Sequence, residues 1–93
     1  WDTGQLHPIM GYVKRNRYAD CEQHLRRILR DTRMSKGIKQ EELAEVLKVP
    51  QSFVSKYESG ERMLTFVETV SICLAMDITP DTLLKEYLPH HET

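Results

Sequence analysis

The sequence predicts a single all-α domain of five short helices. A chain of 93 residues can bury one modest hydrophobic core but not two. Apolar residues recur at the spacing of amphipathic helices, and no stretch alternates with the period of two that marks a strand. Gly and Pro residues punctuate this pattern, so compact packing of helices joined by tight turns is expected.

The first helix is expected to begin at Asp20, because Asp20 and Gln23 have the spacing of a capping box. It should end before Gly37, since glycine is typical of helix C-termini. Its apolar stripe follows the i, i+3, i+4, i+7 rule and is predicted to consist of Leu25, Ile28, Leu29 and Thr32.

A helix-turn-helix arrangement is predicted in the middle of the chain. One helix runs from Gln40 to Leu47, and the next runs from Gln51 to about Glu58 and ends before Gly60. Only residues 48–50 connect the two, and Pro50 suits the first position of the helix that follows. The inner face of the helix from Gln40 to Leu47 is expected to comprise Leu43, Ala44, Val46 and Leu47.

Two more helices complete the predicted fold. Thr65 and Glu68 have capping-box spacing. Pro80 suits the first position of the last helix, with Thr79 as its cap and Pro89 as its end. The inward-facing residues of the fourth helix are predicted to be Phe66, Val67, Val70, Cys73 and Leu74. The stripe of the last helix is either mostly core or reaches a dimer interface, and it comprises Leu83, Leu84, Tyr87 and Leu88.

The third predicted helix separates polar from apolar residues by angle. Its polar side carries Gln51, Ser52, Ser55 and Lys56, and its opposite side carries Phe53, Val54 and Tyr57. Gln can pair with adenine through two hydrogen bonds, Ser can meet several bases, and Lys can meet guanine or phosphate. The polar side is therefore either a surface that enters a DNA major groove or the solvated face of an ordinary amphipathic helix.

The net charge of −1 hides an asymmetry between the two parts of the chain. Residues 1–39 carry nine Lys or Arg and four Asp or Glu, which gives +5, whereas residues 40–93 carry four and ten, which gives −6. Such asymmetry indicates either one side that faces a polyanion or charges that merely solvate helix faces.

Several classes of protein are excluded by what the sequence lacks. Two cysteines cannot form a disulfide framework, and neither they nor the four histidines have the spacing of metal ligands. The longest apolar run, Ile72 to Met76, is too short to span a membrane, and no signal segment opens the chain. Because no phosphate loop or nucleophile motif occurs, we expect a cytoplasmic protein that is not an enzyme and holds no cofactor or metal.

Three sequence segments, taken in their order along the chain, resemble the phage lambda-repressor-like (Cro/cI-type) helix-turn-helix DNA-binding family. The resemblance covers about residues 20–88 and is carried by three segments, residues 40–44, 51–58 and 60–62. It implies a compact five-helix domain that binds double-stranded DNA as a homodimer on an inverted repeat, and so associates with the nucleoid when bound.

The resemblance also assigns roles to individual residues. The base-reading positions are Gln51, Ser52 and Lys56. The backbone-contacting positions are Gln40 and Arg62, with Ser55 and Lys39 placed to join them. Arg33 and Glu58 match a structural ion pair. Three residues depart from the family pattern, which commonly has glycine in place of Lys48 and a Ser or Thr cap in place of Lys39 and Pro50.

The predicted organisation is an N-terminal arm at residues 1–17, the DNA-binding domain at 18–89 and a tail at 90–93. The arm has three interpretations: a basic segment that meets DNA, an apolar segment that packs on the bundle or a second subunit, or a partly vector-derived extension before Met10. The predicted function is a sequence-specific transcriptional regulator, with repression favoured over activation. The alternative is a protein-interaction module on the same fold, such as an antitoxin-like component that binds a protein partner.

Overall fold

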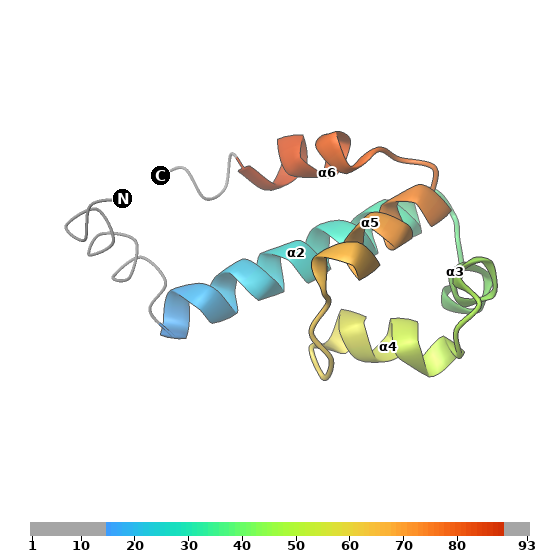
Figure 1. Ribbon diagram of the computed structural model, residues 1–93, viewed down its shortest axis with the longest axis horizontal. Helices are drawn as coiled ribbons and strands as arrows, with labels where there is room; N and C mark the ends of the chain where they lie inside the picture. Colours follow the sequence, from blue (N-terminus) through green and yellow to red (C-terminus); the bar gives the residue numbers. More distant parts are fainter. Residues whose placement is uncertain (1–14, 89–93) are drawn as a thin grey trace.

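A computed structural model describes residues 15–88, and the fold in that range consists of helices alone (Figure 1). The helices are α2 (Arg15–Ser35), α3 (Gln40–Leu47), α4 (Gln51–Ser59), α5 (Phe66–Ala75) and α6 (Pro80–Tyr87). The long helix α2 runs through the bundle with α4 on one side and α6 on the other, while α3 packs on α4 and α5 (Figure 1). The prediction of an all-α domain is confirmed.

One hydrophobic core holds the helices together, and every helix contributes to it. Its buried side chains include Leu29 of α2, Leu43 of α3, Val54 and Tyr57 of α4, Ile72 and Cys73 of α5, and Leu83 of α6. Each fully buried aliphatic or aromatic side chain stabilises the fold by about 1.5–3 kcal/mol relative to an exposed one. The core therefore fixes the positions of α3 and α4 relative to α2.

The prediction that the first helix begins at Asp20 is wrong. Helix α2 begins at Arg15, so Asp20 lies inside the helix and cannot cap it. No Gly or Pro interrupts residues 15–20, so the helix can extend beyond Asp20 towards the N-terminus. A residue acts as an N-cap only where the chain before it is not helical. The first turn of α2 takes up residues 15–17 of the predicted arm. Residues 1–14 of the arm and residues 89–93 lie outside the described part of the chain.

The predicted inner faces of α3 and α5 are partly wrong. Val46 of α3 is 62% exposed, and Phe66 of α5 is 80% exposed. The buried residues of α5 are Ile72 and Cys73, and the exposed ones include Val67 and Leu74. In the apolar stripe of α6, for which two interpretations were given, Leu83 is buried, whereas Leu84 and Leu88, the residue after α6, are about half exposed. Helix α5 carries apolar residues around most of its circumference, so periodicity alone does not identify its buried side.

The predicted start of α5 is confirmed, whereas the other caps differ in detail. The Glu68 N–H donates to Thr65 Oγ1 at 3.1 Å, and the Thr65 N–H donates to Glu68 Oε1 at 2.9 Å, which is a reciprocal capping box. Thr79 precedes α6 as predicted, but its hydroxyl lies 2.8 Å from that of Thr82 instead of capping a backbone N–H. Pro50 is the residue before α4 and not its first helical residue.

Candidate nucleic-acid interface

A turn of three residues sets the angle between α3 and α4. Lys48 ends α3 in the left-handed conformation, with φ at 61° and ψ at 45°. This conformation lets the Val49 N–H donate to the carbonyl of Ala44 at 3.0 Å. Pro50 has an extended backbone conformation, and its carbonyl accepts a hydrogen bond from the Phe53 N–H at 2.9 Å in the first turn of α4. The helix-turn-helix prediction is confirmed. Lys48 adopts the positive φ at the position where the family commonly has glycine.

Helix α4 presents a polar side to solvent and buries its apolar side. Val54 and Tyr57 are completely buried, and Phe53 is half-buried. The four residues on the opposite side are all exposed, and they are Gln51, Ser52, Ser55 and Lys56. The side chains of Ser52, Ser55 and Lys56 make no hydrogen bond or ion pair within residues 15–88. These three side chains are therefore available to a ligand.

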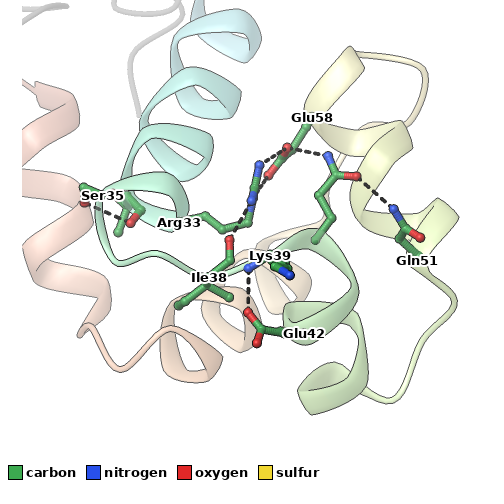
Figure 2. Close-up of polar contacts among 9 residues, drawn as sticks. Arg33, Ser35, Ile38, Lys39, Glu42, Gln51 and Glu58 are labelled. Atoms are coloured by element: carbon green, nitrogen blue, oxygen red, sulfur yellow. Dashed lines mark hydrogen bonds and ion pairs between the residues drawn. The ribbon is translucent and has the colours of Figure 1, made fainter.

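A chain of hydrogen bonds links α2 to the first residue of α4 (Figure 2). Arg33 donates to the carboxylate of Glu58, from Nε to Oε2 at 2.7 Å and from Nη2 to Oε1 at 3.1 Å. Gln40 Nε2 donates to Glu58 Oε1 at 2.9 Å. Gln51 Nε2 in turn donates to Gln40 Oε1 at 3.3 Å. The amide of Gln51 is thus oriented by Gln40, which is oriented by an ion pair.

The ion pair between Arg33 and Glu58 is largely removed from water. Their side chains are 10% and 5% exposed, respectively. Arg33 Nη1 also donates to the carbonyl of Ile38 at 2.7 Å, so the guanidinium binds α4 and the loop before α3 together. The hydrogen bond and the negative charge of Glu58 raise the pKa of Arg33 above its usual value. The Arg33 guanidinium therefore keeps its positive charge, and its hydrogen bonds join α2 to α4 and to the loop before α3.

Arg62 lies in the loop after α4, where Nη1 donates to the carbonyl of Met63 at 3.2 Å and the guanidinium has two further partners. Its Nη1 and Nη2 each donate to the carboxylate of Glu68 at 2.8 Å, and its guanidinium carbon lies 4.5 Å from the centre of the Phe53 ring. The Arg62 hydrogen bonds and the capping N–H of Thr65 lower the pKa of Glu68 to about 2. The guanidinium is therefore held in a fixed position beside α4 while its side chain stays 40% exposed.

Sequence reasoning assigned Glu68 only to the cap of α5 and missed its ion pair with Arg62. The separation of six residues across a loop has no fixed geometry, so no sequence signal would have found the pair. The hydrogen bond between Gln40 and Gln51 was missed for the same reason. Lys39 precedes α3 without a side-chain cap, because ammonium has no acceptor. Its N–H instead donates to Glu42 Oε1 at 2.8 Å.

Residues 15–88 contain neither a helix suited to cross a membrane nor a cluster suited to hold a metal ion. No helix there combines the length and apolar character needed to cross a membrane. No group of three or more His, Cys, Asp or Glu side chains in the same range is arranged to hold a metal ion.

Comparisons with known proteins identify the same fold. A helix-turn-helix family model matches residues 29–83. A solved structure described as an XRE-family like protein from Pseudomonas syringae pv. tomato str. DC3000 is 34% identical in sequence, with a TM-score of 0.80. The similarity covers 86% of this chain and 98% of that one. No curated protein matches the chain.

Proposed function

The chain belongs to the helix-turn-helix family of DNA-binding transcriptional regulators, and we propose that it is a homodimeric repressor that reads an inverted-repeat operator. The observation that carries the proposal is the hydrogen bond from Gln51 to Gln40, at the exposed N-terminal end of α4. Two amides held together at the start of a helix form a pre-oriented surface for a base edge and its neighbouring phosphate.

In this proposal α4 lies in the major groove, which is wide enough to admit a helix. Gln51, Ser52 and Lys56 read base edges from the exposed side of α4, because N-terminal residues of a recognition helix reach furthest into the groove. The DNA backbone is held by polar and basic groups on both sides of α4, namely Gln40, Lys39, Ser55 and Arg62. Contacts to the DNA backbone supply affinity and fix the register of the protein on the duplex, but they carry no sequence information.

Homodimer formation is supported by apolar surface that one copy leaves uncovered. An apolar hollow of about 320 Å³ lies between α2, α5 and α6. Its lining includes Leu64, Phe66 and Leu84, of which Phe66 and Leu84 are also among the exposed large apolar residues. We propose that a second copy covers part of this surface and sets two α4 helices about 34 Å apart, one turn of DNA. Repression then follows from occupancy of a promoter, which needs no additional surface.

The test is selection of binding sites from random duplex DNA at two salt concentrations. Enrichment of an inverted repeat, with half-sites about one helical turn apart, supports a dimeric sequence-specific regulator. Weak binding that ignores sequence and disappears with added salt contradicts base reading by α4. Capture of a protein partner in place of DNA would favour the interaction module instead.

A further inference from the structure

Three arginines of α2 line a second hollow, which faces the C-terminal end of α4. The hollow has a volume of about 320 Å³, and its lining consists of Gln23, Arg26, Arg27 and Arg30 of α2 with Glu58 and Ser59 of α4. Arg27 and Arg30 are exposed, and Arg26 is half-buried. None of the three forms an ion pair or a side-chain hydrogen bond within the described residues 15–88.

The charge in this hollow is unbalanced. Among the described residues that line it, Glu58 alone has a carboxylate, and that carboxylate already accepts hydrogen bonds from Arg33 and Gln40. Like charges that line one hollow repel one another, and an anion bound between them removes this repulsion. Arginine presents a planar fork of N–H donors that matches the oxygens of a phosphate group.

Arg26 is held against the end of α4. A Cβ atom added at Gly60 would lie 3.0–3.3 Å from the guanidinium atoms of Arg26, so the guanidinium rests directly over this glycine. Gly60 has a φ of 93° and ends α4. One donor group of the hollow is therefore positioned before any ligand arrives.

The hollow continues the polar side of α4. Ser59 lies one turn beyond Ser55 and two turns beyond Ser52 and Gln51, on the same side of the helix. Glu58 links the hollow to Gln40 and through it to Gln51, by hydrogen bonds of 2.9 and 3.3 Å. On α2, Arg26, Arg30 and Arg33 follow at i, i+4 and i+7 along one face. A polyanion that lies along α4 therefore reaches these arginines without leaving the polar surface.

We propose that Arg26, Arg27 and Arg30 bind phosphates of the DNA backbone beside the segment that α4 reads. This inference rests on the proposed function and adds α2 to the DNA-binding surface. The ligand is a phosphodiester because the hollow is continuous with the surface of α4. A free phosphate would use the same donors, and the experiment separates these two sources.

The test compares Arg30→Gln with Lys85→Gln, because each variant removes one exposed positive charge. Lys85 belongs to α6, which lies across the bundle from α4 (Figure 1). Binding to the selected operator and to an unrelated duplex is measured across a range of salt concentrations. Arg30→Gln should flatten the slope of log K against log salt by about 0.9 on both duplexes, the value for one lost phosphate contact. Lys85→Gln should leave the slope at the wild-type value.

A double variant, Arg26→Gln/Arg30→Gln, should flatten the slope by about twice as much, provided its circular dichroism matches the wild type. Equal slopes for Arg30→Gln and Lys85→Gln on an operator that the wild type binds would overturn the inference and leave the proposed function intact. Failure of the wild type to bind any duplex would overturn both. Binding of inorganic pyrophosphate that Arg30→Gln abolishes, with unchanged duplex slopes, would assign the hollow to a free anion and overturn the DNA contact.

Discussion

The guanidinium of Arg33 on α2 and the carboxylate of Glu58 on α4 form a two-point ion pair, with Nε 2.7 Å from Oε2 and Nη2 3.1 Å from Oε1. Glu58 also accepts from Gln40, so one carboxylate satisfies donors from two other helices. A bidentate arginine–carboxylate pair fixes relative orientation as well as distance. The pair thus sets the position of α4 against α2 and α3, and the same carboxylate orients the amides at the polar end of α4.

Replacing Arg33 with Met should lower the free energy of unfolding by about 3–5 kcal/mol. The loss arises because Glu58, whose side chain is 5% exposed, would keep a buried charge without its cation. Urea denaturation at pH 7, followed by circular dichroism, measures the change. A double variant, Arg33→Met/Glu58→Leu, is the control and should lose less, because neither charge remains unpaired. A loss below about 1 kcal/mol in the single variant would show that water solvates Glu58 and that the pair is not structural.

Replacing Lys48 with Gly should raise the free energy of unfolding by up to about 1 kcal/mol. Lys48 has a φ of 61°, a conformation that costs an L-residue about 1–2 kcal/mol and that glycine adopts freely. Part of this gain in stability is lost, because glycine has more conformational freedom in the unfolded chain. Thermal unfolding monitored by circular dichroism is a sufficient measurement.

The matched control for Lys48→Gly is Gly37→Ala. It places an L-residue at a left-handed backbone position that glycine now occupies without strain. Gly37 has a φ of 70°, and a Cβ there would meet nothing within 4 Å, so backbone strain alone would cause the loss. Gly37→Ala should destabilise by about 1 kcal/mol. Destabilisation by both variants would mean that the Lys48 side chain stabilises the turn more than its backbone strains it.

The turn and cap residues predicted the fold well because their signals are local. Thr65 and Glu68 form the reciprocal cap that their spacing indicates, and Gly60 ends α4 as expected. Local signals fail where the neighbouring chain decides the outcome. Asp20 has the spacing of a cap but lies inside a helix that starts at Arg15, and Phe66 is apolar yet 80% exposed. Whether a residue faces the core depends on which helices pack against it, and one sequence does not contain that information directly.

The candidate site was predictable only as a set of residues. The family resemblance assigns Gln40 and Gln51 to DNA contacts and Glu58 to a structural ion pair, but the hydrogen bonds that join the three depend on how α3 and α4 pack. The partner of Arg62 was likewise not predictable, because Glu68 reaches it across a loop. Long polar side chains have many rotamers, so their contacts follow from the packed fold and not from spacing.

The ion pair between Arg62 and Glu68 predicts a loss of stability in acid. Glu68 has a pKa of about 2 in the folded chain and near 4.5 when unperturbed, so its stabilising effect is complete above about pH 4.5. As the pH falls from 4.5 towards 2, the unfolded state takes up the proton first and this contribution disappears. Melting temperatures measured from pH 5 to pH 2 should therefore fall less steeply for Glu68→Gln than for the wild type.

Glu45→Gln is the control for this pH effect, because Glu45 is exposed on α3 and forms no ion pair within residues 15–88. Its melting temperatures should keep the wild-type dependence on pH. Parallel curves for the wild type and Glu68→Gln would mean that Arg62 does not hold Glu68 in its ionised form in solution.

Replacing Gln51 with Ala should weaken operator binding by about 1–3 kcal/mol and relax the preference at one base position. The Gln51 amide is exposed at the N-terminal end of α4, and Gln40 accepts one of its hydrogen bonds at 3.3 Å, so its oxygen and second N–H remain for a base edge. Fluorescence anisotropy with the selected operator, and with variants changed at single base pairs, measures both effects.

Two further variants separate base reading from backbone contact. Arg62→Ala should weaken all sequences alike and flatten the salt slope by about one, because a phosphate contact carries no sequence information. Gln40→Ala should do both: it removes a proposed backbone contact and also the acceptor that orients Gln51. If Gln51→Ala lost the same affinity on every duplex, Gln51 would be a backbone contact, and base reading by α4 would depend on Ser52 and Lys56 alone.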